Sequence, residues 1–215
     1  MIGFHPSYSD PRDDILKYVP NQARRVLDVG CSIGLLGKTI KERCAAEVTG
    51  IEINEEMATV AEKNLDRIIV GDVENIHLRD HFKSEYFDCI ILADILEHLK
   101  DPWTLLRNLT YFLCEKGLVI SSIPNVRHYT TLFQLACRGH WPYRDRGIHD
   151  KTHLRFFALK NIKDLFDNSA LRIIEIEEKY RLIERPHRYN RISRYFALPL
   201  VKPLLVFQYI VLAEK

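Results

Sequence analysis

The sequence predicts an α/β fold built on an open, mostly parallel sheet. Short apolar runs alternate with segments of helical periodicity along most of the 215 residues, and this alternation is typical of parallel strands joined by right-handed helical crossovers. The first apolar run also leads through a glycine turn directly into a helical pattern. With 47% hydrophobic and 28% charged residues, the chain can bury one core, so we expect a single domain over residues 1–215.

The strands are expected where continuous apolar runs occur, because strands buried on both faces have this pattern. These runs lie near 26–29, 47–52, 67–70, 86–92, 117–121, 171–179 and 206–213. Helical periodicity falls near 12–18, 34–44, 55–64, 101–113, 128–137 and 159–168. Residues 138–157 have neither pattern and are rich in arginine, histidine and aromatic side chains. Long loops of this kind in compact domains are commonly functional, and 181–205 is a second variable segment.

The turn after the first strand has the sequence Asp28-Val29-Gly30-Cys31-Ser32-Ile33-Gly34. A glycine turn at a helix N-terminus lets the backbone approach a ligand closely. Two further carboxylates, Glu52 and Asp72, follow the second and third strands. Glu52 is placed to accept both ribose hydroxyls, and Asp72 to accept from the amine of an adenine ring. In a parallel sheet these carboxylates meet at one edge, which predicts a nucleoside site.

These motifs resemble those of class I S-adenosylmethionine (SAM) dependent methyltransferases. The resemblance covers about half of the chain and includes Asp28–Gly34, with Ser32 at the middle glycine, then Glu52, Gly71-Asp72-Val73 and the fourth-strand segment 87–99. It implies a Rossmann-like, doubly wound, seven-stranded sheet whose last strand is antiparallel, for which residues 206–213 are well placed. It also implies SAM as cofactor and S-adenosylhomocysteine as product.

A narrower resemblance lies farther along the chain, in residues 123–128 and 147–157. Both segments are similar to a branch of bacterial small-molecule methyltransferases often associated with surface-glycan pathways. This similarity supports a branch of the family rather than a substrate. From the whole sequence we expect a small-molecule acceptor, with an oxygen of a glycan-related or other metabolite as the methylated atom.

Site residues follow from the motifs and the resemblance together. The residues expected to bind the cofactor are Tyr8, Asp28, Gly30, Cys31, Gly34, Glu52, Ile53, Asp72, Val73 and Ala93. Arg12 is a further candidate, directed toward the SAM carboxylate. The residues expected to bind the acceptor are Arg127, His128, Tyr143 and Arg155. No metal ion is expected.

Methyl transfer to a hydroxyl requires in-line alignment and removal of a proton, so a base is expected near the acceptor. The candidates are His98, which follows the fourth strand, and His149 and His153 in the 138–157 loop. Each has a structural alternative: His98 can begin a helix, and the two loop histidines can order the loop. The basic loop with Trp141 and Tyr143 suits an anionic acceptor that carries a ring, or is a solvated loop packed on Trp141.

The sequence also bears on four other functions. Gly30-Cys31-Ser32-Ile33-Gly34 also fits the Gly-x-Ser-x-Gly elbow of α/β-hydrolases, but only one plausible helix precedes it. An NAD-binding fold lacks its Gly-x-Gly-x-x-Gly spacing here. A net charge of +2, and Ala93-Asp94-Ile95-Leu96 in place of an Asn/Asp-Pro-Pro-aromatic tetrad, argue against a nucleic-acid methyltransferase. A SAM-binding regulatory protein without catalysis stays open.

Cysteine usage and hydropathy predict a cytoplasmic location. The five cysteines are odd in number and include no Cys-x-x-Cys pair, and the N-terminus has no signal-peptide pattern. Residues 196–213 are apolar over the length of a membrane helix, but two prolines, Lys202 and Gln208 favour a loop or short helix followed by a buried strand. Peripheral membrane contact through Arg188, Arg191 and Arg194 is the second interpretation.

Overall fold

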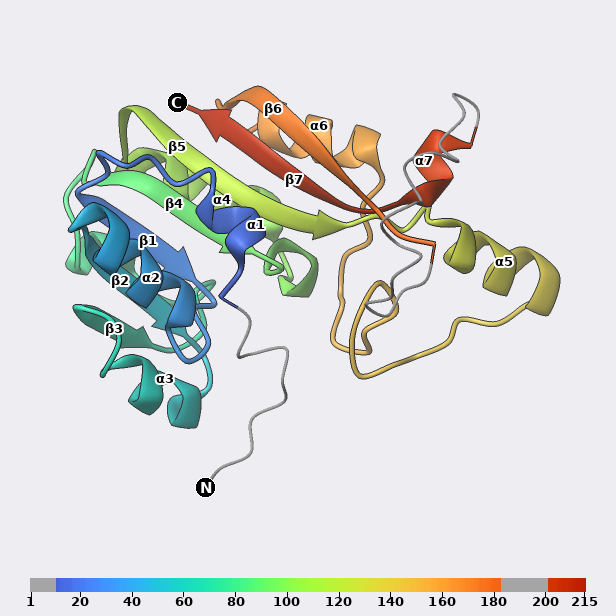
Figure 1. Cartoon of the computed structure of the whole chain (residues 1–215), viewed down its shortest axis with the longest axis horizontal. Coiled ribbons are helices and arrows are strands. Elements are labelled where there is room, and N and C mark those ends of the chain that lie inside the picture. The colour runs from blue at the N-terminus through green and yellow to red at the C-terminus, as the bar shows by residue number, and fades with distance from the viewer. Residues whose placement is uncertain (1–10, 183–200) are drawn as a thin grey trace.

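The structure is a computed structural model that describes residues 11–182 and 201–215. Figure 1 shows one twisted sheet with helices on both faces. The predictions for Tyr8 and for Arg188, Arg191 and Arg194 lie outside the described residues.

One seven-stranded sheet runs through the described residues in the order β3-β2-β1-β4-β5-β7-β6. The strands are β1 (Arg25–Val29), β2 (Glu47–Glu52), β3 (Arg67–Val70), β4 (Phe87–Ala93), β5 (Leu113–Pro124), β6 (Arg172–Tyr180) and β7 (Val206–Glu214). The pairs among β1 to β5 are parallel, whereas β7 is antiparallel to both β5 and β6. The predicted doubly wound sheet with an antiparallel last strand is therefore confirmed.

All six expected helices are present. They are α1 (Asp13–Leu16), α2 (Leu35–Cys44), α3 (Glu55–Ala61), α4 (Pro102–Phe112), α5 (Tyr129–Arg138) and α6 (Leu159–Asp167). The short helix α7 (Lys202–Leu205) agrees with the loop or short helix expected before the last strand, whereas the 3-10 turns η2 (Leu78–Asp80) and η3 (Leu96–His98) were not predicted. Within the described residues no helix has the length and apolar character to cross a membrane, and the apolar 206–213 stretch forms β7.

The core lies on both faces of the sheet. The adjacent residues Val26 and Leu27 are both fully buried, but they belong to different clusters because side chains alternate along a strand. Leu27 packs in the cluster that α4 and α6 cover, and Val26 in the cluster that α1 and α2 cover. A strand buried on both faces explains why β1 appears in the sequence as a continuous apolar run.

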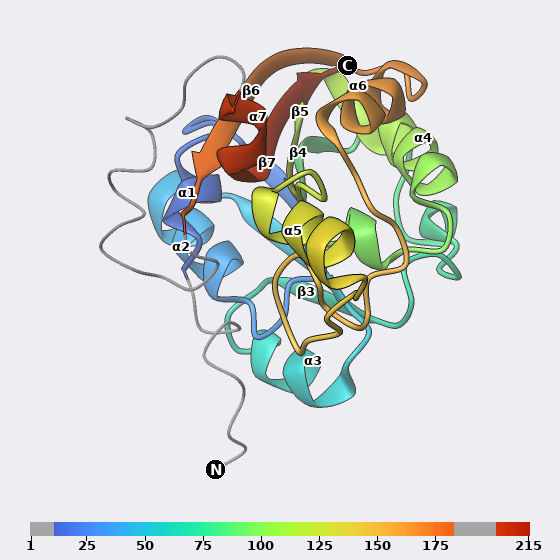
Figure 2. The same ribbon diagram turned by 90° about the vertical axis from the view of Figure 1, so that its right-hand side faces the viewer.

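The carboxyl ends of the parallel strands meet at the edge that faces the viewer in Figure 2. Helix α5 lies over this edge, and the segment between α5 and α6, called here the 139–158 loop, lies beside it. Isolated bridges pair Asn125 with Phe157 and Arg144 with Asp150, and these bridges fix the loop against the end of β5 and against itself. The sheet thus presents its carboxyl edge to the loop that sequence analysis expected to cover the acceptor.

Candidate active site

The turn between β1 and α2 brings backbone N–H groups to the sheet edge. Gly30 has φ +72°, and its N–H donates to the carbonyl of Ile51 at 2.8 Å. A Cβ atom at position 30 would lie 2.0 Å from Cδ1 of Ile95, so any other residue there has to displace the Ile95 side chain and adopt a strained φ. Ser32 also has a positive φ, +53°, which explains why a glycine is usual at the position that this chain fills with serine.

Glu52 joins two of the loops at this edge. Its Oε2 accepts from the Ser32 N–H at 2.8 Å and its Oε1 from the Asn54 N–H at 2.9 Å, and the side chain is buried. Each carboxylate oxygen can accept a second hydrogen bond, so the orientation suits a pair of hydroxyls. The next residue, Ile53, is 66% exposed, and an exposed apolar side chain beside a fixed carboxylate fits the base and ribose of a nucleoside.

Asp72 and Asp28 complete the row of carboxylates. Asp72 accepts from the Glu74 N–H at 3.0 Å and from the Asn75 amide at 2.9 Å, which orders the segment after β3 around Val73. Burial raises the pKa of Asp28 to about 7, while the Arg12 charge lowers it and Glu52 raises it further. A cationic ligand near Asp28 would stabilise the charged carboxylate, and SAM carries cationic groups. The residues at this edge therefore fit the cofactor that the sequence implies.

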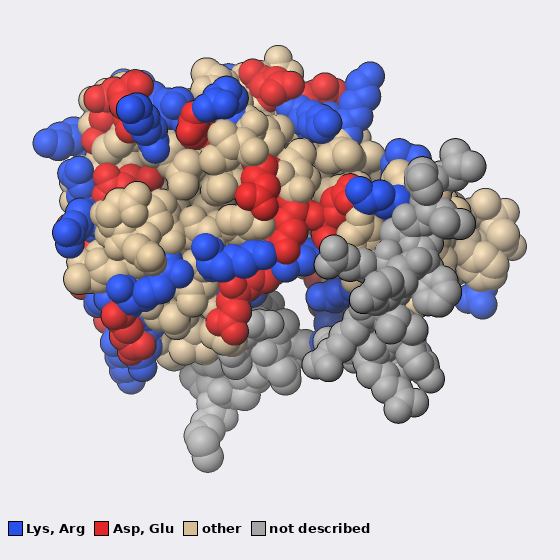
Figure 3. Space-filling model, turned by 45° about the horizontal axis from the view of Figure 1, so that its top comes forward, with Lys and Arg blue, Asp and Glu red and all other residues tan. Residues whose placement is uncertain are grey.

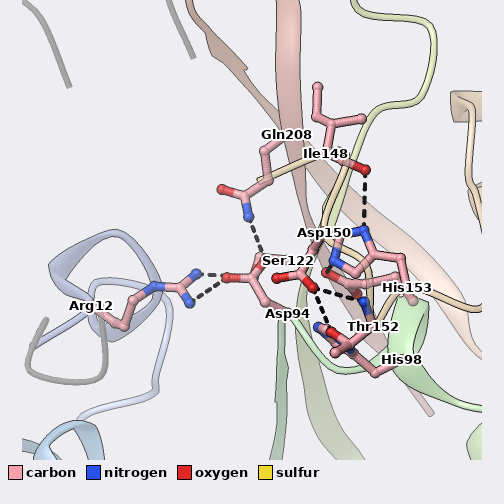
Figure 4. Close-up of polar contacts among 10 residues, drawn as sticks. Arg12, Asp94, His98, Ser122, Ile148, Asp150, Thr152, His153 and Gln208 are labelled. Carbon is pink, nitrogen blue, oxygen red and sulfur yellow. Dashed lines mark hydrogen bonds and ion pairs between the residues drawn. The ribbon is translucent and has the colours of Figure 1, made fainter. Parts of the chain in front are cut away.

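Arg12 is held by contacts within the protein. Its guanidinium donates to Asp94 at 2.7 Å and to the Ser122 hydroxyl at 2.9 Å (Figure 4). Ser122 and the Gln208 amide both donate to the other Asp94 oxygen. This Asp94 network, Arg12, Asp94, Ser122 and Gln208, ties the segment before α1 to the ends of β4 and β5 and to β7. Sequence analysis missed three of its members because strands far apart in the sequence supply them.

Two of the three candidate bases meet beside the Asp94 network. His98 is in η3 and His153 in the 139–158 loop, and their ring centroids lie 4.6 Å apart with an interplanar angle of 75°. Nδ1 of His98 lies 3.0 Å from the Thr152 hydroxyl, and Nδ1 of His153 lies 3.2 Å from the carbonyl oxygen of Ile148. Burial and the neighbouring His98 lower the pKa of His153, so its ring is neutral at neutral pH.

Glu97 lies beside this pair and is not among the site residues that sequence analysis predicted. It is 1% exposed, and Oε1 lies 4.0 Å from Nε2 of His153. Burial, with the Asp94 charge next, raises the pKa of Glu97 well above its ordinary value. Its position could have identified it, because an acid directly before a candidate base, just after a strand, is itself a candidate site residue.

Two other predicted histidines are buried in packing contacts. His149 is fully buried, with Nε2 3.1 Å from the Thr131 hydroxyl and its ring against Trp141. His128 is also fully buried, and its ring nitrogens contact the Thr130 hydroxyl and the Arg181 carbonyl, both at 2.8 Å. These contacts order the loop and the start of α5, so the geometry gives no support to a catalytic role for His149 or an acceptor-binding role for His128.

The remaining acceptor candidates differ in how they are held. Arg127 is exposed, and Tyr143 is 75% exposed. Arg155 instead donates through Nε and Nη2 to the Lys100 carbonyl, and its guanidinium lies 5.7 Å from the Trp103 ring centroid. The backbone N–H of Arg155 also donates to the Glu97 carbonyl, at 2.9 Å. Arg155 thus anchors the loop to the segment between β4 and α4, which contains η3.

Comparisons with known proteins agree with this geometry. A family model described as a methyltransferase domain matches residues 5–176. A ubiquinone biosynthesis O-methyltransferase of Coxiella burnetii is 26% identical over 172 residues, which cover 75% of this chain and 70% of the relative.

Two solved structures share the fold. A SAM-dependent methyltransferase from Archaeoglobus fulgidus has a TM-score of 0.68 at 20% identity, covering 98% of this chain and 97% of its own. One from Mesorhizobium loti has a TM-score of 0.65 at 16% identity, covering 96% and 98%. Since the family model spans most of the chain and the edge of the sheet fits the cofactor, this chain belongs to the methyltransferase domain family and is a SAM-dependent methyltransferase.

Proposed function

We propose that this enzyme transfers the methyl group of SAM to an oxygen of a small-molecule acceptor, with a glycan-related metabolite as the first class to test. The observation that carries the proposal is the meeting of His98, at the end of β4, with His153 of the 139–158 loop. The pair lies at the same sheet edge as the cofactor carboxylates, on the side that the loop covers.

In this proposal the cofactor lies along the ends of β1, β2 and β3. SAM supplies an activated methyl group, so the protein has to align the acceptor and manage one proton. Glu52 holds the ribose, Asp72 and Val73 the adenine, and Gly30, Cys31 and Gly34 the chain that carries the sulfonium. Ile53 and Ala93 line the same edge, and Asp28 orders the turn.

The proton of the acceptor hydroxyl is managed at the histidine pair. The Ile148 carbonyl can only accept a hydrogen bond, so Nδ1 of His153 carries the ring proton and Nε2 carries the lone pair. A neutral imidazole with a free lone pair can accept a proton at neutral pH. His153 is therefore the first candidate for the base, with His98 beside it.

Recognition of the acceptor is assigned to exposed side chains around the loop. Tyr143 offers an aromatic surface and Arg127 a cation, a combination that suits an anionic acceptor with a ring. The name of the Coxiella relative supports O-methylation of a small molecule. The face shown in Figure 3 mixes basic and acidic side chains, which does not favour nucleic acid as the acceptor.

Two measurements test the proposal. Calorimetric titration with S-adenosylhomocysteine, beside NAD, is expected to give micromolar binding of the former alone. Isotope-labelled SAM is then screened against nucleotide sugars and hydroxylated ring compounds. His153→Ala is expected to slow turnover at saturating SAM without weakening S-adenosylhomocysteine, whereas His140→Ala, an exposed histidine of the same loop, leaves both unchanged. Binding without transfer to any acceptor would favour the regulatory alternative.

A further inference from the structure

Three side chains of two types converge at the acceptor side of the site. Glu97, His98 and His153 offer one carboxylate oxygen and two ring nitrogens, and these atoms all lie within 4.8 Å of one another. We propose that this histidine cluster, Glu97, His98 and His153, binds a divalent first-row transition-metal ion of the zinc type. The inference rests on the proposed function and changes one role in it: with an ion on Nε2, His153 is a ligand rather than the base, and the ion activates the acceptor hydroxyl.

Both imidazoles have a hydrogen-bond partner at Nδ1, and Figure 4 shows these contacts. The Thr152 hydroxyl donates to Asp150 at 2.6 Å, so it accepts from Nδ1 of His98. The Ile148 carbonyl accepts from Nδ1 of His153. Each ring thus keeps its lone pair on Nε2. Metal-binding histidines are commonly fixed in this way, with the second nitrogen donating to a carbonyl, or to a carboxylate directly or through another group.

The carboxylate of Glu97 is incompletely satisfied without a further partner. Its side chain is 1% exposed, and within residues 11–182 and 201–215 no hydrogen-bond partner is found for Oε2. A buried carboxylate oxygen without a partner is costly, and a bound cation is one way to satisfy it. The other oxygen is 4.0 Å from Nε2 of His153, which is too long for a hydrogen bond.

That separation is somewhat longer than a shared ion requires. Bonds from zinc to nitrogen or oxygen are about 2.0–2.2 Å, so two ligands of a tetrahedral ion lie about 3.4 Å apart. Binding of the ion therefore requires the ligand atoms, which lie within 4.8 Å of one another, to move closer together. Glu97 and His98 are consecutive in η3, so we expect the main adjustment at His153 of the loop.

The donor set selects the class of ion. Two imidazoles and one carboxylate suit zinc, cobalt, iron or manganese, whereas magnesium and calcium prefer oxygen ligands. Three protein ligands leave a coordination position open, which the hydroxyl of an acceptor can occupy. Coordination lowers the pKa of a bound hydroxyl. The O–H bond then breaks with its proton passing to solvent, the oxygen pair bonds to the methyl carbon, and the pair of the breaking C–S bond stays on sulfur.

The test uses the untagged full chain in a Cys137→Ser background, because Cys137 is an exposed thiol that can bind metals itself. After chelator treatment, cobalt is added and the visible absorption is followed, and zinc is then used to displace it. We expect one equivalent of cobalt, displaced by zinc, and no competition from a large excess of magnesium.

The variants separate ligation from folding. Glu97→Gln and His153→Ala are each expected to weaken cobalt binding more than 100-fold, and Thr152→Val, which removes the partner of His98, about 10- to 100-fold. The matched control His140→Ala keeps full binding. Circular dichroism and S-adenosylhomocysteine affinity verify that each variant is folded. Thr152 is exposed, so Thr152→Val still tests the metal site if a variant at a buried position unfolds.

The outcomes distinguish this inference from the proposed function. Failure to bind cobalt or zinc, or binding that persists in Glu97→Gln, His153→Ala and Thr152→Val alike, overturns the metal site. Full methyl transfer by the chelator-treated enzyme also overturns the activating role while leaving the proposed function intact. One bound equivalent that the variants abolish establishes the site even if none of the screened acceptors is methylated.

Discussion

The cofactor edge and the acceptor edge of this site are built differently. At the cofactor edge, Asp28, Glu52 and Asp72 each lie at or just beyond the end of their own strand, and Glu52 is fixed by backbone N–H groups of two adjoining turns. At the acceptor edge, His98 meets a histidine 55 positions later, and Glu97 has one oxygen without a partner among the described residues. The first edge is preorganised by its backbone, whereas the second keeps polar groups that a ligand can complete.

The largest effect should come from adding a side chain at Gly30, in the turn between β1 and α2. Gly30→Ala places a Cβ 2.0 Å from Ile95 and forces alanine to a φ of +72°, so we expect a loss of about 2–5 kcal/mol in unfolding free energy and loss of S-adenosylhomocysteine binding. Urea unfolding and calorimetry measure both.

A matched pair of variants separates strain from collision at this turn. Gly139→Ala, with φ +58° and no atom within 4 Å of the new Cβ, should cost only about 1–2 kcal/mol. Adding Ile95→Ala to Gly30→Ala removes the two colliding carbon atoms and should restore part of the stability. If Gly30→Ala behaved like Gly139→Ala, the close approach of the turn to Ile95 would be disproved.

The next effect concerns the ribose carboxylate. Glu52→Ala removes two charge-assisted bonds to the Ser32 and Asn54 N–H groups and the proposed ribose contact, so S-adenosylhomocysteine should bind more weakly by about 1–3 kcal/mol. Glu52→Gln should lose less because one acceptor oxygen remains. The exposed Glu56→Ala on the adjoining helix serves as the control. Unchanged affinity in Glu52→Ala would remove the ribose assignment.

A pH dependence should isolate Asp28. Its pKa is about 7 in the folded protein against an ordinary value of 3.8, so the folded state holds the proton more tightly than the unfolded state. The stability from this group is complete below the ordinary value and is lost as the pH rises through 7, with a slope of about 1.4 kcal/mol per pH unit in between. Between pH 5 and pH 6, the unfolding free energy of the wild type should therefore fall more steeply than that of Asp28→Asn. Equal changes in the two proteins would contradict the burial of this carboxyl.

The smallest effect should come from the anchor of the acceptor edge. Arg155→Ala removes the bonds to the Lys100 carbonyl and should cost about 0.5–1.5 kcal/mol in stability. It should raise the KM of the acceptor, once identified, with little change in S-adenosylhomocysteine affinity. Arg146→Ala, an exposed arginine of the same loop, tests for a general charge effect. Equal changes in both variants would show that the anchor is unimportant.

The comparison also explains what the sequence could predict. The seven strands and the cofactor carboxylates follow from local patterns, because an apolar run and the residue after it fix both the strand and the edge position. The pairing of His98 with His153, and the contacts of Asp94 with Arg12 and Gln208, depend on tertiary placement of segments without periodicity. The burial of His128 and His149 was likewise not predictable, since a histidine in a loop has the same local pattern whether it is exposed or enclosed.

The insertion of β7 between β5 and β6 sets an order of assembly. Within the described sheet, β6 pairs only with β7, so β6 has no strand to join until the last strand along the chain is in place. The same strand brings Gln208 to Asp94 and accepts hydrogen bonds from Asn125, the residue that follows β5. Because such distant contacts form late in folding, we expect that partly folded chains lack the acceptor edge. Methyl transfer is then expected only after β7 and β6 have paired with the rest of the sheet.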